Sequence, residues 1–229
     1  MQTDGAYVIA SFFSYYNIVF LLDALLATLL LSLFGCVIGA IAGFMLAISR
    51  RSTSLPFLPL RIAAGLFVET FRRVPFLVTL MLIFFIFQFV RLDVSLFIVA
   101  LASVCLIATA YITETIRSGL ESVHRNQWDA AIAMNLSAAQ TLAYVIIPQA
   151  WKVVLPPVFS FFILFIKDTA LASQIGVVEL TYAGKVLNDK GFPASLVFGT
   201  ILVLYFVLSY PLTRLGAWME ATLAPSRSR

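Results

Sequence analysis

The chain has 229 residues, of which 62% are hydrophobic and 11% are charged, and its mean hydropathy is +1.01. A soluble globular domain carries roughly 45–50% apolar and about 25% charged residues, so the composition excludes an ordinary soluble protein. A membrane-spanning helix needs about 20 apolar residues, and the length therefore allows roughly four to seven spans and no large soluble domain. The 2 cysteines make no disulfide framework or metal-ligand spacing, and the net charge of +4 is best explained by basic cytoplasmic loops.

Long apolar segments follow one another along the chain and predict about five membrane-spanning helices. Their expected ranges are 22–49, 74–90, 94–116, 153–178 and 194–215. A lipid-facing barrel would need short segments of alternating polarity, whereas these runs are continuously apolar. The sequence therefore predicts an all-α integral membrane protein in which residues 1–229 form one transmembrane domain. The first residues carry no basic side chain, which argues against a cleaved signal peptide.

The stretch 55–90 is too long for a single span. As one helix it would measure about 50 Å, against roughly 30 Å for the hydrocarbon core, and charged residues and Pro75 interrupt its middle. We expect a helix over 55–73 that enters from the interface, followed by a span that begins near Pro75. One strongly tilted, kinked helix is the alternative.

Three glycines in the first predicted span, Gly35, Gly39 and Gly43, recur every four residues. This spacing places them on one helix face, where the backbone of a second helix can approach closely. We interpret them as a packing surface and not as a chemical site.

Lysine and arginine are distributed unevenly between the two sides of the predicted spans. The richer side carries Arg50, Arg51, Arg117, Arg125, Lys152, Arg214, Arg227 and Arg229. The other side carries Arg91, Lys185 and Lys190, each close in sequence to an aspartate. Because cytoplasmic loops are enriched in basic residues, we expect the N-terminus outside and the C-terminus in the cytoplasm.

The cytoplasmic segment 121–151 is long enough to have structure of its own. Asn126 is expected to cap a first short helix, and Ser137–Gln140 matches a capping box that opens a second. Between them, Asn135 is suited to the left-handed conformation that ends helices. We expect Pro148 to break the second helix before the fourth span.

The first of these short helices exposes small and apolar side chains. It offers Trp128, Ala130, Ala131 and Ile132. Such a surface on a water-exposed hairpin indicates a partner protein, but the hairpin lying on the membrane surface explains the same composition equally well.

Two runs of this segment, 126–137 and 145–150, resemble the cytoplasmic signature of the permeases of ABC importers. In that signature a Glu-Ala-Ala triplet comes first and a Gly follows at a fixed spacing. A Leu-Pro or Ile-Pro pair comes last. This chain departs from it at Asp129, which stands for the Glu, and at Asn135, which stands for the Gly. The Pro-Gln-Ala ending resembles the polar amino acid uptake branch. Three further segments support this branch: 68–75, 110–117 and 165–172.

The resemblance implies a type I importer fold and a set of partners in the inner (plasma) membrane of a bacterium. Two permeases, identical or paralogous, would pair, two ATPase subunits would dock from the cytoplasm, and a binding protein would deliver an amino acid from outside. The cytoplasmic hairpin would be the coupling helix, with its contact residues Trp128, Asp129, Ala130, Ala131, Ile132, Asn135 and Pro148. No Walker-type phosphate loop occurs in the sequence, so we expect no cofactor and no catalytic or metal site in this chain, with ATP and Mg²⁺ bound by the ATPase.

Ionisable residues within spans are costly and indicate functional positions. Lys167 and Asp168 fall near the middle of the predicted fourth span, followed by Thr169 and Ser173. Asp168 could hold a substrate ammonium, and Lys167 could neutralise it or meet a carboxylate; an ion pair between helices is the structural alternative. Gln88 is a further candidate for the path.

Two charged pairs near the cytoplasmic side suit a gate or helix-end salt bridges. Glu114 and Arg117 are three residues apart and can bridge on one helix face. Glu69 has the same relation to Arg72, and a four-residue spacing to Arg73.

The outer segment 179–193 is interpreted either as a contact for the binding protein or as a solvated connector. For the whole chain, a gradient-driven secondary carrier or channel is the alternative function, although such folds usually have more spans and inverted repeats. A membrane enzyme would need a cluster of His, Cys or acidic residues, which the sequence does not supply.

Overall fold

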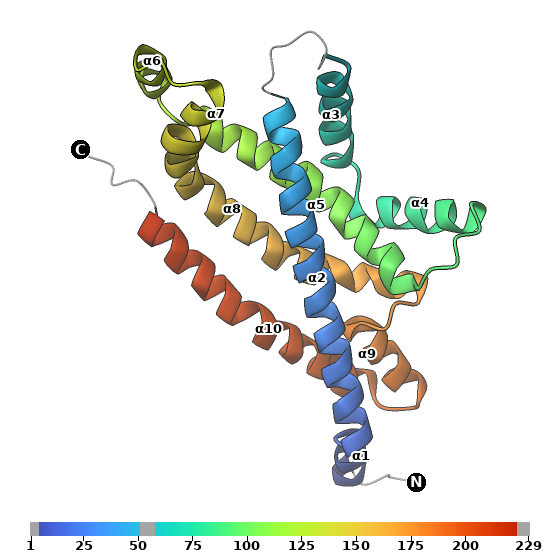
Figure 1. The fold of residues 1–229 in the computed structure, drawn as a ribbon. Helices are drawn as coiled ribbons and strands as arrows, with labels where there is room; N and C mark the ends of the chain where they lie inside the picture. The colour runs from blue at the N-terminus through green and yellow to red at the C-terminus, as the bar shows by residue number, and fades with distance from the viewer. Residues whose placement is uncertain (1–4, 51–57, 224–229) are drawn as a thin grey trace. The chain divides into compact units, whose positions relative to one another are not determined.

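The structure is a computed structural model that describes residues 5–50 and 58–223. Figure 1 labels its α-helices, which are α1 (Gly5–Phe12), α2 (Tyr15–Ser49), α3 (Leu58–Phe71), α4 (Phe76–Phe89), α5 (Leu96–Glu121), α6 (Arg125–Ala133), α7 (Ala138–Gln140), α8 (Ile147–Asp168), α9 (Leu180–Asp189) and α10 (Ala194–Leu223). The π-helical η2 (Thr141–Ile146) precedes α8, and the 3₁₀-helical η3 (Thr169–Ile175) follows it. The orientation residues Arg51, Arg227 and Arg229 and the expected helix start at Leu55 lie outside the described residues.

Four helical segments are long and apolar enough to cross a membrane by themselves: Tyr15–Ser49, Leu96–Glu121, Ala138–Ile175 and Ala194–Leu223. The broken pair α3 and α4 makes a fifth if the two helices form one span. The described residues form helices and no strand. The prediction of an all-α membrane protein with about five spans is confirmed.

The interruption between α3 and α4 lies where the charged residues and Pro75 interrupt the apolar run. Pro75 has an extended backbone (φ −58°, ψ 142°) and directly precedes the first residue of α4. A proline suits this place because its missing N–H would be unpaired at a helix start in any case. The structure thus has two helices here, with a break at 72–75 where the sequence predicts the change from one helix to the next.

The described residues divide into two compact units, which we describe separately. The first unit comprises residues within 1–35, 75–104 and 164–211, and the second comprises residues within 36–74, 105–163 and 212–229.

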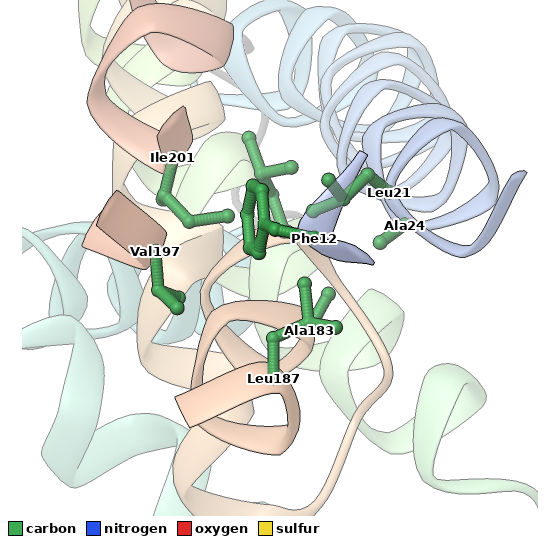
Figure 2. Packing of buried hydrophobic residues seen from close by; sticks show 8 residues of the cluster. Phe12, Leu21, Ala24, Ala183, Leu187, Val197 and Ile201 are labelled. Atoms are coloured by element: carbon green, nitrogen blue, oxygen red, sulfur yellow. The ribbon is translucent and has the colours of Figure 1, made fainter. Parts of the chain in front are cut away.

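An apolar core organises the first unit around Phe12, the last residue of α1 (Figure 2). Phe12 is fully buried, and its ring packs edge-to-face on Phe192 with a centroid distance of 5.2 Å. The core joins residues of α2, α9 and α10, and its buried members are Phe12, Leu21, Ala24, Leu180, Ala183, Leu187, Val197 and Ile201. Helix α9 therefore belongs to the body of this unit, and the interpretation of 179–193 as a solvated connector is wrong.

Close helix packing in the second unit depends on glycine. A Cβ on Gly39 would lie 2.5 Å from the Ala108 Cβ, and one on Gly43 would lie 3.0 Å from the Thr113 nitrogen. In the first unit, a Cβ on Gly35 would lie 2.3 Å from a methyl of Val104. The glycines therefore let α2 and α5 pack backbone to backbone, as their spacing predicted.

The hairpin in the second unit corrects two details of the sequence reading. The first short helix begins two residues earlier than predicted: His124 is its N-cap instead of Asn126, and the His124 Nδ1 accepts the Asn126 N–H at 3.2 Å. Pro148 does not break the second helix, because it is the second residue of α8 and the six-residue π-helical turn η2 precedes it. A wider turn relieves the clash that a proline ring makes with the preceding turn of an α-helix.

Candidate functional site

The α6–α7 hairpin of the second unit presents a partly apolar groove. The turn is a Schellman motif, in which the Leu136 N–H donates to the Ala131 carbonyl at 3.1 Å and the Asn135 N–H to the Ile132 carbonyl at 2.8 Å. Asn135 adopts φ 57°, as its type predicted, and the Ser137 capping box with Gln140 is formed. The groove has a volume of about 410 Å³ and is lined by Ile48, Trp128, Ile132, Leu136, Ala138, Thr141 and Leu142.

The two alanines of this hairpin differ in accessibility. Ala130 is exposed with its neighbour Asp129, whereas Ala131 is fully buried. Ala131 therefore offers no surface to a partner, which corrects the expectation for that residue. Ile132 is 70% exposed and Trp128 is half-buried, so both remain on the surface of the hairpin.

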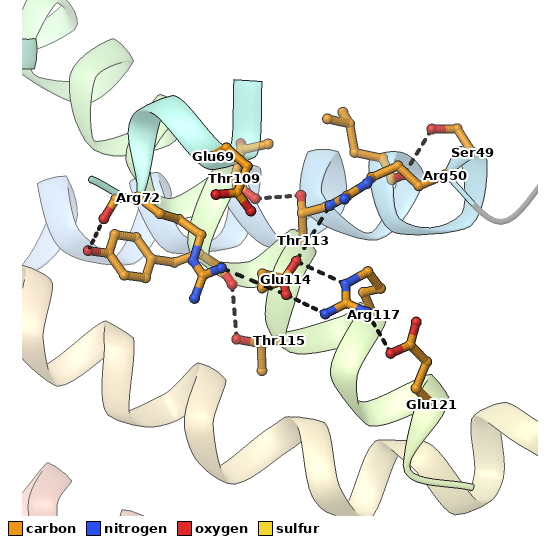
Figure 3. A network of polar contacts seen from close by, with 12 residues as sticks. Ser49, Arg50, Glu69, Arg72, Thr109, Thr113, Glu114, Thr115, Arg117 and Glu121 are labelled. Carbon is orange, nitrogen blue, oxygen red and sulfur yellow. Dashed lines mark hydrogen bonds and ion pairs between the residues drawn. The ribbon is translucent and has the colours of Figure 1, made fainter. Parts of the chain in front are cut away.

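Glu114, in α5, is the centre of an ion-pair cluster in the second unit (Figure 3). It pairs with Arg117 one turn further along α5, with Arg50 at 3.4 Å and with Arg72 at 3.7 Å. Arg117 also contacts Glu121 at 2.5 Å. The Glu114 side chain is only 19% exposed, so one carboxylate is shared by guanidinium groups from three segments of the chain.

The pairing of Glu69 resolves an alternative that the sequence left open. Glu69 bridges to Arg73 at 2.5 Å, and both side chains are largely exposed. Arg72 points instead to Glu114, and its carbonyl accepts the Tyr111 hydroxyl at 3.3 Å. Arg72 and Glu114 share a polar pocket of about 320 Å³ with Thr115, Ser118, Gly119, Val153 and Pro157.

The candidate path residues of the first unit lie where α8 ends. Lys167 and Asp168 are the last two residues of α8, and the helical segment that could span the membrane continues past them through η3 to Ile175. Lys167 is exposed and Asp168 is partly buried. Thr169 is fully buried, and its hydroxyl donates to the Ile166 carbonyl at 2.9 Å.

The two remaining path candidates differ in exposure. Ser173 is 5% exposed, and its hydroxyl oxygen accepts a hydrogen bond from the Lys185 ammonium at 3.1 Å. Gln88 is exposed near the end of α4, and α4 packs against η3. Ser173 thus has a partner within the chain, whereas Gln88 has a side chain open to its surroundings.

The sequence reading missed a buried carboxylate in the first unit, Glu179. It is fully buried, caps α9 by accepting the Tyr182 N–H at 2.7 Å, and accepts the Tyr205 hydroxyl at 2.9 Å. Burial raises the pKa of Glu179, against the hydrogen bonds of Thr181, Tyr182 and Tyr205 and the charge of Lys185, which lower it. The apolar residues of α9 recur with helical spacing, and that pattern could have revealed a helix with Glu179 at its start.

A metal centre has no basis in this geometry. Among residues 5–50 and 58–223, no group of three His, Cys, Asp or Glu side chains is placed to hold a metal ion. What the described residues do provide is an exposed hairpin, a cluster of ion pairs at Glu114, and a charged end of α8 beside a buried polar network.

Known proteins resemble this chain over nearly its whole length. It is 31% identical over 223 residues to the probable glutamine ABC transporter permease protein GlnP of Bacillus subtilis, covering 96% of this chain and 98% of the relative. It is 32% identical over 197 residues to the L-cystine transport system permease protein TcyB of the same organism, covering 86% and 83%. A crystal structure of an amino acid ABC transporter with histidines superposes with a TM-score of 0.84 at 26% identity, covering 97% of this chain and all of that one.

The family comparison agrees with these likenesses and with the fold. Residues 35–223 match the family described as binding-protein-dependent transport system inner membrane component. The resemblance to ABC importer permeases that the motifs indicated is confirmed, and with it a multi-pass protein of the inner membrane. This chain belongs to the family of inner membrane components of binding-protein-dependent transport systems.

Proposed function

We propose that this chain forms the translocation path of an ATP-driven importer for amino acids. The observation that carries the proposal is the full-length likeness to permeases named for glutamine and cystine. A binding protein delivers the substrate from outside, and a second permease, identical or paralogous, completes the path. The N-terminus lies outside and the C-terminus in the cytoplasm, as the basic residues suggest.

The energy enters through the hairpin. The sequence has no phosphate-binding loop, so ATP and Mg²⁺ bind to partner ATPase subunits, and this chain is not itself an enzyme. The ATPase docks on the exposed residues Trp128, Asp129, Ala130 and Ile132, with Ala131 and Asn135 holding the turn in shape. Because α6 and α7 both contact η2, a force on the hairpin passes into the helix that contains Pro148.

The substrate path uses the charged end of α8. Asp168 and Lys167 offer one charge of each sign to a zwitterionic amino acid, and Gln88 offers an uncharged amide. The Glu114 cluster acts as a gate on the cytoplasmic side, because ion pairs between Arg50, Arg72 and Glu114 connect separate segments and can re-form in another arrangement.

The test is uptake by proteoliposomes that contain the chain with its ATPase and binding protein. The probes are radiolabelled L-glutamine, L-cystine and L-histidine, with ATP trapped inside or left out. We expect uptake of at least one of them that requires both ATP and the ATPase subunit. Uptake driven by an ion gradient without the ATPase would overturn the proposal in favour of a secondary carrier.

The path assignment has its own test. Asp168→Asn removes the negative charge at the end of α8 and should reduce uptake more than it reduces the amount of assembled complex. Unchanged uptake by this variant would remove Asp168 from the path.

A further inference from the structure

The segment that follows Asp168 has a shape that needs support from outside itself. Asp168 is the N-cap of η3, a 3₁₀ helix of seven residues. Runs of 3₁₀ helix longer than three or four residues are uncommon because their hydrogen bonds have poor geometry. The segment ends at Gly176 with φ 90°, and the Val177 N–H donates back to the Ala172 carbonyl at 3.2 Å. These local contacts close the end of η3, and the rest of the segment depends on its own 3₁₀ hydrogen bonds and on the helices α4 and α9 that pack against it.

Lys185 supplies a contact to that middle. Its ammonium donates to the Ser173 hydroxyl at 3.1 Å, and Ser173 is 5% exposed. Lys185 comes from α9, which packs against η3. A hydrogen bond from a charged donor is stronger than one between neutral groups, so Lys185 fixes Ser173 of η3 to α9 more firmly than a neutral side chain would.

Helix α9 is itself fixed to its neighbours by buried polar groups. The Glu179 carboxylate accepts the Tyr205 hydroxyl of α10 at 2.9 Å, and the Thr181 and Tyr205 hydroxyls lie 3.0 Å apart. On the other side, the Leu180 N–H donates at 3.1 Å to the hydroxyl of Thr28, a residue of α2. The chain of contacts therefore runs from α2 and α10 through α9 to Ser173.

We propose that Lys185 is a positioning residue, which holds η3 through Ser173 and so sets where Asp168 meets the transported amino acid. Ser173 then acts as the acceptor for Lys185 and not as a contact of the substrate. This inference rests on the proposed function, because it concerns the geometry of the same path.

The experiment measures uptake and binding-protein-stimulated ATP hydrolysis on the same proteoliposomes of the complete complex. The probe is whichever of L-glutamine, L-cystine and L-histidine the wild-type complex transports best. Lys185→Met keeps an unbranched side chain of similar length and removes the ammonium donor. We expect uptake to fall about tenfold while stimulated hydrolysis stays within about twofold, so that more ATP is used per amino acid. Loss of folded complex would lower both rates together and leave their ratio unchanged.

Further variants separate positioning from bulk stability. Lys190→Met makes the same change at the exposed end of the same helix, and it should leave the ratio unchanged. Lys185→Arg keeps a charged donor and should restore most of the uptake. Ser173→Ala should reproduce the defect of Lys185→Met, and the double variant should be no worse than either, because both remove one contact.

Four results would overturn the inference. These are an unchanged ratio in Lys185→Met, an equal defect in Lys190→Met, additive defects in the double variant, or a defect in Ser173→Ala with normal Lys185→Met. The last result would return Ser173 to the substrate path. A wild-type complex that transports none of the probes with ATP would instead count against the proposed function itself, so the two failures are distinguishable.

Discussion

The two compact units each contain a shielded carboxylate, and the two groups have opposite surroundings. Glu114 of the second unit is shared by arginines whose own side chains remain 21–37% exposed. Glu179 of the first unit is fully buried and receives hydrogen bonds from a backbone N–H and a tyrosine hydroxyl. Arginine side chains are long and flexible, so the guanidinium groups around Glu114 can exchange partners. The neutral donors at Glu179 belong to helices and hold one geometry. The comparison suggests that the ion pairs of Glu114 open and re-form. The hydrogen bonds of Glu179, by contrast, permanently join α9 to α10.

Removing the Glu179 carboxylate should have the largest effect on stability. Glu179→Ala removes the cap of α9 and leaves the buried Tyr182 N–H without its acceptor, which should cost about 3 kcal/mol of unfolding free energy. The apparent melting temperature of the purified complex measures it. Glu220→Ala, an exposed glutamate on α10, is the control. Equal decreases of the melting temperature in the two variants would show that Glu179 does not hold α9 to α10.

Glu114→Gln should affect transport more than stability. The variant leaves Arg50, Arg72 and Arg117 without their shared charge, at a cost of about 2 kcal/mol, below that of a fully buried pair because the side chain keeps some exposure. We expect uptake in proteoliposomes to fall at least about tenfold with assembly largely kept. Glu121→Gln, with its 58% exposed side chain, should be nearly silent. Normal uptake in Glu114→Gln would contradict a gating role.

The pH dependence of stability should show how the burial of Glu179 sets it apart from Glu114. Because burial raises the folded-state pKa of Glu179, the folded state binds this proton more tightly than the unfolded chain does. Its stabilising contribution is therefore full below the usual carboxyl range and is lost as the pH rises through the raised pKa. Because glutamine mimics the protonated carboxyl, melting curves of wild type and Glu179→Gln should run together at low pH and separate as the pH rises through the raised pKa, where only wild type loses stability. Curves that stay parallel over this range would argue against a raised pKa.

The smallest effect is expected at the exposed pair Glu69–Arg73. With side chains 53% and 79% exposed, the pair should contribute at most about 0.5 kcal/mol. Glu69→Gln should leave melting temperature and uptake close to wild type, even at low salt. A tenfold loss of uptake would instead place Glu69 beside Glu114 in the gate.

The sequence predicts the features that depend on residues close together in the chain. The features that it does not predict depend on contacts between distant residues. The capping box at Ser137, the left-handed Asn135 and the pair Glu114–Arg117 all depend on residues a few positions apart. Arg50, which meets Glu114 from 64 residues away, could not be found by spacing alone. The apolar surface of α9 was overlooked because its short helical pattern lies between two polar ends, and Glu179 was missed with it.

The hairpin predictions failed where neighbours decide the outcome. Ala130 and Ala131 are adjacent and chemically identical, yet only the second is buried in the folded hairpin, where α6 packs against η2. Pro148 was expected to end a helix, but the π-helical turn before it accommodates the ring. Both results depend on backbone geometry that a proline or alanine does not specify by itself.

The most direct measurement is ATP-dependent uptake together with ATPase co-purification for Ala130→Arg. This change adds bulk and charge to the exposed surface of α6 without touching the buried Ala131. Ala221→Arg makes the same change at an exposed alanine of α10 and serves as the control. If the hairpin is where an external ATPase drives this permease, Ala130→Arg should lose the ATPase subunit and most uptake while the control keeps both. Normal co-purification and normal ATP-dependent uptake in Ala130→Arg would contradict that claim.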